Sequence, residues 1–459
     1  MKLSSRMKAI LYRLGNMKKW LVFLLLPVLT ILIFPDVKSQ ETGTLTLSLS
    51  DAISIGLENN YQVRISREEL KIAQNNNTPG AAGRYPSLDF TATQRNSFNN
   101  SESMTVPDDR DKLTTNYLSP AVALNWTIFD GFRVNITRDK LQSLEELSEG
   151  LSAMVIENTV QSIILAYYNV LLQTEKLHVF EEVKALSGDR LEYMEVKKQF
   201  GSAVTYDVLQ ANDAFLSDSV NYLSQELNLK NATLLLKLLL ALDETINFQL
   251  TDEFSVQVND YALDTLLNRM LDNNKNLRNQ YVNQKILEYS TSLAKGQKYP
   301  GLYLGAGADY ANTRLKYSGE DPNSRYSFGY YANFTLSFNL FNGGATRRAV
   351  QNALISEDIG VITVSEMTKA LTNQLVNQFD LFGIRKQLLM VAEVSQESTG
   401  LNLQISEDKF KSGAINSFNF RDIQLRYLNA SIRRLEAIYN LIDTETELLR
   451  LTGGIVSED

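Results

Sequence analysis

The sequence contains no cysteine and only one histidine, His178, and these absences exclude several classes of site. Without thiols the chain can form no disulfide, no Cys/His zinc site and no cysteine nucleophile, and a Ser-His pair would need the single histidine. His178 lies in a helical stretch, so we interpret it as a structural residue rather than a proton switch. No pair among the 53 acidic residues forms a recognisable glycosidase motif. We therefore expect no enzyme, no metal site and no cofactor.

Proline is also scarce, with eight residues in a chain of 459. Two long intervals contain none, from Pro120 to Pro300 and from Pro322 to the end. Because proline interrupts helix interiors, both intervals are free to form long helices. Apolar residues recur at spacings of three and four between positions 132 and 200, which predicts a helix of 69 residues, on the order of 100 Å long. A compact domain does not need such a rod.

The N-terminal segment has the composition of a secretory signal peptide. A basic pair precedes the apolar run 20–34, and residues 37 and 39 fit the small-residue rule for cleavage, so we expect the mature chain to begin near Gln40. This segment carries seven Lys/Arg and one Asp, so its removal changes the net charge from −8 to about −14, which argues against a nucleic-acid partner. Elsewhere no run approaches the roughly 20 apolar residues of a membrane-spanning helix, so a chain that crosses a membrane would do so as a β-barrel.

The chain is a tandem repeat, because short motifs of the first half recur in the second half. The pairs at an offset of 214 residues are Asn59-Asn60 with Asn273-Asn274, Arg64 with Arg278, and Tyr85-Pro86-x-Leu88 with Tyr299-Pro300-x-Leu302. The pairs at an offset of 212 residues are Phe129-Asp130-Gly131 with Phe341-Asn342-Gly343, and Gly201 and Asp207 with Gly413 and Asn419. Since the order of motifs is the same in both halves, each half should fold into the same series of elements.

After each Tyr-Pro step the apolar period changes from about 3.6 to 2. In the second half, alternate residues from Ala332 to Leu340 are apolar, and the residues between them are Asn, Thr or Ser. This alternation predicts strands with one apolar and one wet surface, and we interpret two hairpins with strands about ten residues long as part of a membrane-spanning β-barrel. The polar segments 96–117 and 314–325 read as loops. The alternative is an ordinary antiparallel sheet on a soluble core.

We divide the sequence into a signal peptide (1–39), a first repeat (40–242), a linker (243–260), a second repeat (261–452) and a tail (453–459). The first repeat is predicted to contain a helix, a β-hairpin over 85–129, a long helix over 132–200 and a helix over 206–242. The second is predicted to contain a helix, a β-hairpin over 299–341, a long helix over 345–410 and a helix over 418–451.

Barrel strands that continue into pairs of long helices, together with the duplicated motifs above, resemble the TolC-type outer-membrane efflux proteins. This resemblance implies an α+β membrane protein in which each protomer of a homotrimer gives four strands to a 12-stranded β-barrel in outer-membrane lipid, continuous with a long α-helical barrel in the periplasm. The implied function is a passive conduit in the outer membrane of a Gram-negative bacterium, coupled to a periplasmic adaptor and an inner-membrane pump, for export of small molecules, drugs, metal ions or proteins. The alternative function is a secreted or periplasmic coiled-coil interaction protein, for which the mature chain would be water-soluble.

The resemblance also implies a gate where the helix-turn-helix segments converge. Members of the family carry aspartates just after these turns, and the matching positions here are Asp207, Asn419 and Asp422. Asn419 departs from the usual aspartate, and Ile415 replaces a basic residue that some members use as a latch. The alternative to a gate is that each carboxylate is solvated near a helix N-terminus and stabilised by the helix dipole.

Two further sets of residues are expected to act at the ends of the molecule. The turn tips are Gly201, Ser202, Ala203, Gly413 and Ala414, which we expect to shape backbone turns and to contact the adaptor. The aromatic girdle of the barrel is expected to include Tyr85, Phe129, Tyr299 and Phe341.

Overall fold

The structure is a computed structural model that describes residues 45–102, 110–317 and 319–455. The predicted signal peptide lies outside the described residues, as do the last four residues of the predicted tail. Within the described part of the chain, no helix combines the length and the apolar composition needed to cross a membrane.

The chain divides into two compact units. The smaller unit includes residues 45–46 and 245–249. In it the backbone N–H of Leu45 donates to the carbonyl of Asn247, as part of the pairing between β1 (Leu45–Leu47) and β4 (Phe248–Leu250). The segment 243–260, predicted to be an irregular linker, therefore contains one short strand.

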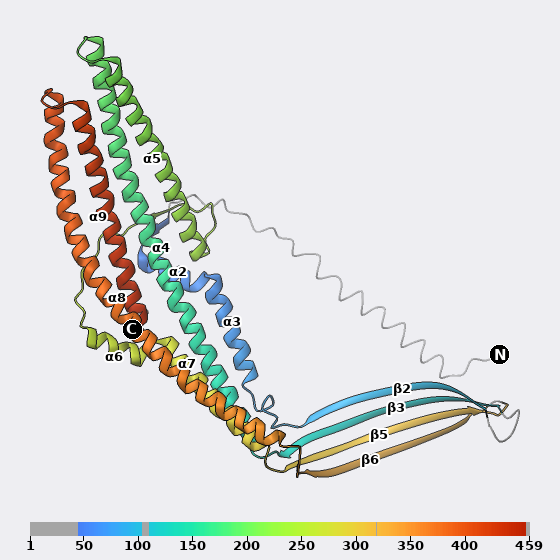
Figure 1. Cartoon of the computed structure of the whole chain (residues 1–459). Helices are drawn as coiled ribbons and strands as arrows, with labels where there is room; N and C mark the ends of the chain where they lie inside the picture. The colour runs from blue at the N-terminus through green and yellow to red at the C-terminus, as the bar shows by residue number, and fades with distance from the viewer. Residues whose placement is uncertain (1–44, 103–109, 318, 456–459) are drawn as a thin grey trace, which may run out of the picture. The chain divides into compact units, whose positions relative to one another are not determined.

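The larger unit contains two copies of one series of elements. The first copy consists of α2 (Leu49–Asn59), α3 (Tyr61–Asn76), β2 (Ser87–Glu102), β3 (Arg110–Phe129), α4 (Arg133–Gln199) and α5 (Thr205–Leu240). The second consists of α6 (Leu263–Asn273), α7 (Lys275–Gly296), β5 (Gly301–Tyr317), β6 (Asn323–Ser337), α8 (Ala345–Lys411) and α9 (Ser417–Leu451). Figure 1 shows α4 beside α5 and α8 beside α9, and each of these pairs is a helical hairpin.

Each repeat begins with two short helices, not with the single helix predicted from the sequence. The break falls at Asn60 in the first repeat and at Asn274 in the second, the equivalent asparagines of the repeated motif. The Asn274 side-chain oxygen accepts from the N–H of Leu277 (3.0 Å), and its amide nitrogen donates to the carbonyl of Leu451 (2.9 Å). Asn60 does the same with the N–H of Gln62 and the carbonyl of Leu239. Each asparagine thus caps one helix and ties it to the last helix of its own repeat.

We expect Asn274→Ala to destabilise the protein by about 2–3 kcal/mol, because it removes a helix cap and leaves a buried carbonyl unpaired. Asn274 is 1 % exposed, so water does not replace the lost donor. Asn273→Ala is the matched control, because Asn273 is next to Asn274 in the sequence and its side chain is exposed. Urea unfolding followed by circular dichroism measures both variants, and equal stability of the two would contradict the clamping role.

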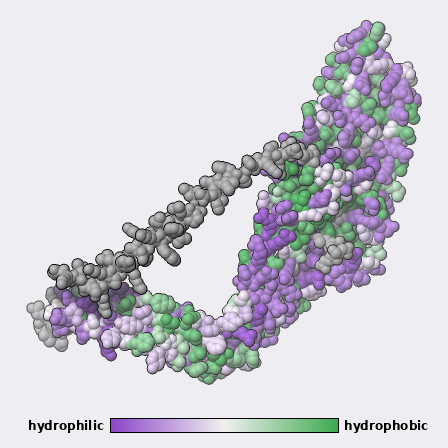
Figure 2. All heavy atoms as spheres, turned by 180° about the vertical axis from the view of Figure 1, so that it is seen from behind, coloured by the Kyte–Doolittle hydropathy of each residue, from purple (hydrophilic) through white to green (hydrophobic). Residues whose placement is uncertain are grey.

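The four long strands form one antiparallel sheet in the order β2-β3-β5-β6 (Figure 1). The register places Leu88 opposite Leu124, Leu124 opposite Ala306, and Ala306 opposite Ala332, so these residues share one face. Large apolar side chains on this face are open in the single chain; Phe334, for example, is 72 % exposed. Figure 2 shows apolar residues gathered over part of the sheet, with more hydrophilic residues beyond them.

The strands are longer than the ten residues predicted, with lengths of 16, 20, 17 and 15 residues. The segments predicted as loops are largely strand where the structure describes them: Asn96 pairs with Asn116, and Arg314 pairs with Ser324. These segments lack the alternation of apolar and polar residues that predicts a strand, because the backbone pairing continues beyond the apolar part of the sheet. A hairpin that extends into water needs no apolar face there.

The helices bury most of the core of the larger unit. Helices α4 and α8 have 67 residues each, which corresponds to about 100 Å. One core cluster joins α6, α7, α8 and α9 around Met270, Leu375 and Leu441. A second cluster lies near the hairpin turns, around Met194, Phe410 and Phe420. This second cluster joins the two hairpins where the sequence predicted a functional site.

Candidate functional site

The two hairpin turns share one backbone motif. At the end of α4, Gly201 has a φ of 75°, and the N–H of Ser202 donates to the carbonyl of Lys197 (2.7 Å). At the end of α8, Gly413 has a φ of 77°, and the N–H of Ala414 donates to the carbonyl of Lys409 (2.8 Å). Both are Schellman turns, in which glycine takes the left-handed conformation that other residues disfavour. The repeated glycines therefore end the long helices, and the left-handed backbone conformation explains why glycine is present at both positions.

The predicted gate residues follow these turns, and their side chains are engaged in local contacts. The Asp207 carboxylate accepts from the N–H of Val204 (3.3 Å) at the start of α5. The exposed Asp422 carboxylate pairs with Arg426 one turn further along α9 (2.7 Å). The N–H of Asn419 donates to the side chain of Asn416, which caps α9 (2.8 Å). Among the described residues, no hydrogen bond or ion pair joins Asp207 to Asn419 or Asp422, so a single chain does not bring the three side chains together.

A buried ion pair that the sequence did not reveal joins the two hairpins. Arg421 of α9 donates to both carboxylate oxygens of Asp218 of α5, at 2.6 and 2.7 Å. The Asp218 side chain is only 2 % exposed and that of Arg421 16 %. The partners lie 203 residues apart and have no local signature, which explains why sequence inspection missed them. Arg421 is therefore a cation that links the two hairpins.

Other polar contacts reinforce this junction between the hairpins. The hydroxyl of Tyr193 on α4 donates to the carbonyl of Lys411 at the end of α8 (3.0 Å). The hydroxyl of Tyr427 on α9 donates to the carboxylate of Glu182 on α4 (3.0 Å). Burial, and then the nearby Glu182 charge, raise the pKa of the Tyr427 hydroxyl above its ordinary value, so Tyr427 remains a donor.

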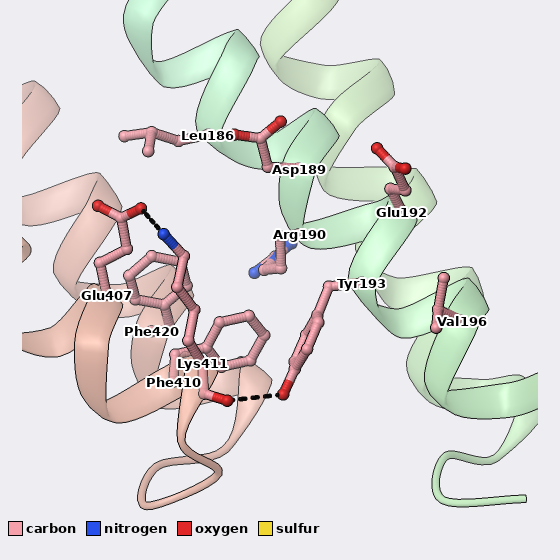
Figure 3. Close-up of a pocket in the computed structure, with 10 residues that line it drawn as sticks. All are labelled: Leu186, Asp189, Arg190, Glu192, Tyr193, Val196, Glu407, Phe410, Lys411 and Phe420. Atoms are coloured by element: carbon pink, nitrogen blue, oxygen red, sulfur yellow. Dashed lines mark hydrogen bonds and ion pairs between the residues drawn. The ribbon is translucent and has the colours of Figure 1, made fainter. Parts of the chain in front are cut away.

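A cleft of about 360 Å³ lies between α4 and the ends of α8 and α9 (Figure 3). Its apolar lining includes the stacked rings of Phe410 and Phe420, whose centroids are 4.8 Å apart. Arg190 extends from α4, and its Nη1 donates to the carbonyl of Ser417 (3.3 Å). Arg190 is 2 % exposed, and its Nε and Nη2 atoms are buried with no hydrogen-bond partner among the described residues. Burial, and then the Arg421 charge, lower the pKa of Arg190 to about 10.

The aromatic residues predicted to form a girdle lie at the junctions between strands and helices. Phe132, which the sequence did not single out, packs edge-on against Phe129 (5.1 Å) and Tyr299 (6.3 Å). Tyr85 and Phe341 are exposed. Phe132 has a φ of 67°, an unusual value for a residue with a side chain, whereas Gly344 occupies the equivalent position of the second repeat. The cluster of Phe129, Phe132 and Tyr299 therefore forms at only one of the two junctions.

In the part of the chain that the structure describes, no group of histidine and acidic residues could hold a metal ion. The site is instead a set of hydrogen bonds, ion pairs and apolar contacts between two helical hairpins. This arrangement can hold the hairpins together or release them.

A sheet with an exposed apolar face, continuous with long helical hairpins that meet at their turns, defines an outer-membrane channel with a helical extension. Residues 52–242 and 266–454 match the family model described as outer membrane efflux protein. The chain therefore belongs to the outer membrane efflux protein family. This match confirms the predicted family and fold class, and it makes the protein an outer-membrane channel component of an efflux system.

Solved structures show the same fold at low sequence identity. The chain is similar to CusC, with 17 % identity, a TM-score of 0.71, and coverage of 88 % of this chain and 92 % of CusC. It is similar to the outer membrane channel CmeC of Campylobacter jejuni, with 15 % identity, a TM-score of 0.71, and coverage of 90 % and 87 %. It is also similar to the open state of the MtrE outer membrane channel of Neisseria gonorrhoeae, with 12 % identity, a TM-score of 0.66, and 89 % coverage of both chains. A search among curated proteins gives no match.

The family is one of outer-membrane efflux channels. The alternative of a water-soluble coiled-coil interaction protein leaves the exposed apolar face of the sheet unexplained.

Proposed function

We propose that three copies of the chain assemble into one passive conduit, with a sheet of four strands from each copy closing a single barrel. The supporting observation is that β2 and β6 lie at the two ends of the sheet order, so within the described residues each has one edge that faces no further strand. Four strands cannot close a barrel wide enough for a channel, and open edges of this length favour pairing with another chain. The repeats 40–242 and 261–452 then supply equivalent hairpins around the ring.

The lumen of such a conduit is defined by the polar face of the sheet. Asn125, Gly305 and Asn333 lie opposite one another in the register, on the face away from Leu124 and Ala306. This face suits water and polar cargo, and the apolar face suits lipid. The conduit needs no site complementary to one cargo, and its selectivity depends on width and charge.

The helical hairpins would form the periplasmic entrance. The Asp218–Arg421 pair holds α5 to α9, and Tyr193 and Tyr427 hold α4 to the other hairpin. We assign this arrangement to a closed or narrowed entrance, which opens when the hairpins separate. A periplasmic adaptor, coupled to an inner-membrane pump, would act at the turns around Gly201–Ala203 and Gly413–Ala414.

The assembly is tested with the purified full-length protein in detergent and in planar lipid bilayers. We expect the mass of a trimer by light scattering, and discrete ion conductance after insertion. A monomer that inserts into no bilayer would contradict the proposal. Because the chain has no cysteine, pairs of introduced cysteines on β2 and β6 can also report contacts between copies by cross-linking.

Charge reversal at Asp422 tests the proposed acidic entrance. In a trimer, three copies of this carboxylate would attract cations, although the ion pair with Arg426 reduces the effect of each. We expect Asp422→Lys to lower the preference for cations over anions, measured as reversal potential in a salt gradient. Glu397→Lys, an equal charge change on the exposed surface of α8, is the control. An unchanged reversal potential for Asp422→Lys would exclude Asp422 from the entrance.

A further inference from the structure

The cleft beside the hairpin turns contains a cationic edge that the chain leaves unfilled. Nε and Nη2 of Arg190 form one side of the planar guanidinium group. In the described part of the chain both are buried without a hydrogen-bond partner, whereas Nη1 donates to the carbonyl of Ser417. The Nε–Nη2 side of arginine matches the two oxygens of a carboxylate, which it binds through two parallel hydrogen bonds. A buried charge with free donors is costly, so this edge favours an anionic partner.

Acidic side chains near Arg190 are engaged elsewhere or point elsewhere. Asp218 is bound on both oxygens by Arg421, and Glu407 pairs with Lys411 at 2.6 Å. Figure 3 shows the Glu192 carboxylate on the side of α4 away from α8 and α9, and the Asp189 carboxylate pointing away from the Arg190 guanidinium group. The charges of Arg421 and Asp218 act on Arg190 in opposite directions, and the effect of Arg421 is the larger. The free edge of Arg190 therefore has no acidic partner among these groups.

The walls of the cleft are suited to a flat apolar body. Phe410 and Phe420 stack with an interplanar angle of 10°, and Tyr193 meets Phe410 edge-on at 5.1 Å. Leu186 and Val196 complete the apolar lining. The volume of about 360 Å³ is within the range of small-molecule sites, roughly 300–1,000 Å³.

We propose that this cleft binds a small organic acid in which a carboxylate is attached to an aromatic or similarly apolar body. The carboxylate lies against Nε and Nη2 of Arg190, and the body lies along Tyr193 and the Phe410–Phe420 pair. The cleft is lined by α4 from one hairpin and by α8 and α9 from the other, so the bound acid bridges the two hairpins. Binding therefore favours the arrangement in which they are held together. This inference concerns binding alone and does not depend on the conduit function.

The experiment measures binding of radiolabelled benzoate to the purified full-length protein in detergent, by equilibrium dialysis. We expect saturable binding that unlabelled benzoate displaces at least about tenfold more effectively than benzyl alcohol, which lacks the charge, or inorganic phosphate, which lacks the apolar body. These comparisons use the unmodified protein and need no variant. Absence of saturable binding, or displacement by benzyl alcohol or phosphate as effective as by benzoate, overturns the proposal.

Two variants locate the site. Arg190→Gln is expected to weaken benzoate binding at least about tenfold, because it removes the charged fork. Val196→Trp, at a residue that lines the cleft and is 43 % exposed, is expected to weaken binding by occupying the space. Arg426→Gln removes an exposed arginine that does not line the cleft and is expected to leave the affinity unchanged. Wild-type affinity in both Arg190→Gln and Val196→Trp overturns the assignment.

Discussion

Replacing Arg421 by alanine is expected to open the junction between the two hairpins. The change leaves the Asp218 carboxylate buried and unpaired, and breaking a buried ion pair on one side costs about 3–5 kcal/mol. Hydrogen exchange measured by mass spectrometry should show protection in the first turns of α9 and the facing part of α5 falling by roughly two to three orders of magnitude. Conductance in planar bilayers should rise with the same change.

Two controls separate this effect from a general loss of charge. Arg426→Ala removes the exposed partner of Asp422, and exposed pairs contribute about 0–1 kcal/mol, so protection should change little. The double variant Asp218→Leu/Arg421→Met replaces both partners by apolar side chains and should recover much of the protection. If Arg421→Ala and Arg426→Ala behave alike, the buried pair does not hold the hairpins.

Replacing Gly131 by alanine is expected to destabilise the junction between β3 and α4. Gly131 has a φ of 74°, and an added Cβ would lie 2.4 Å from the carbonyl oxygen of Gly296 and 2.8 Å from the Cβ of Tyr299. The left-handed conformation costs about 1–2 kcal/mol with a side chain, and the overpacking adds about 1–3 kcal/mol. Thermal unfolding and the yield of assembled protein in detergent measure the loss.

The repeat itself supplies the control for this prediction. Gly343 is the equivalent residue of the second repeat, with a φ of 64°, but an added Cβ there meets nothing within 4 Å. Gly343→Ala should therefore cost only the conformational part, about 1–2 kcal/mol. Equal losses for the two variants would show that contact with Gly296 does not matter.

The sequence predicted the parts of this fold that depend on local pattern. Alternation from Ala332 to Leu340 predicted a strand, and β6 contains residues 332–337 of it but ends before Phe338. Gly201 and Gly413 predicted turns, because each signal lies within a few residues of the feature it specifies. It predicted the family from the order of such motifs. The sequence did not reveal the helix breaks at Asn60 and Asn274. A polar residue does not interrupt the apolar periodicity of a helix, and only the structure shows the capping hydrogen bonds of these asparagines.

The candidate site was less accessible to sequence reasoning. The sequence pattern predicted that Asp207, Asn419 and Asp422 follow the hairpin turns. In the structure these residues lie near the starts of α5 and α9. A ring of carboxylates requires several copies of the chain, and the sequence of one copy does not specify contacts between copies. The contacts that hold the hairpins together within one chain include those of Asp218, Arg421 and Arg190, whose partners are distant in sequence.

Asn60 and Asn274 each fix one end of the second helix of a hairpin, α5 or α9, so that the helix can tilt about that end. Asn60 ties the last turn of α5 to the start of α3, and Asn274 ties that of α9 to the start of α7. Helix α5 has 36 residues and extends about 54 Å from its clamp, so a tilt of about 10° would carry its far end about 9 Å. A small change of angle at the asparagine contact is thereby magnified into a displacement of several ångströms at the hairpin turn.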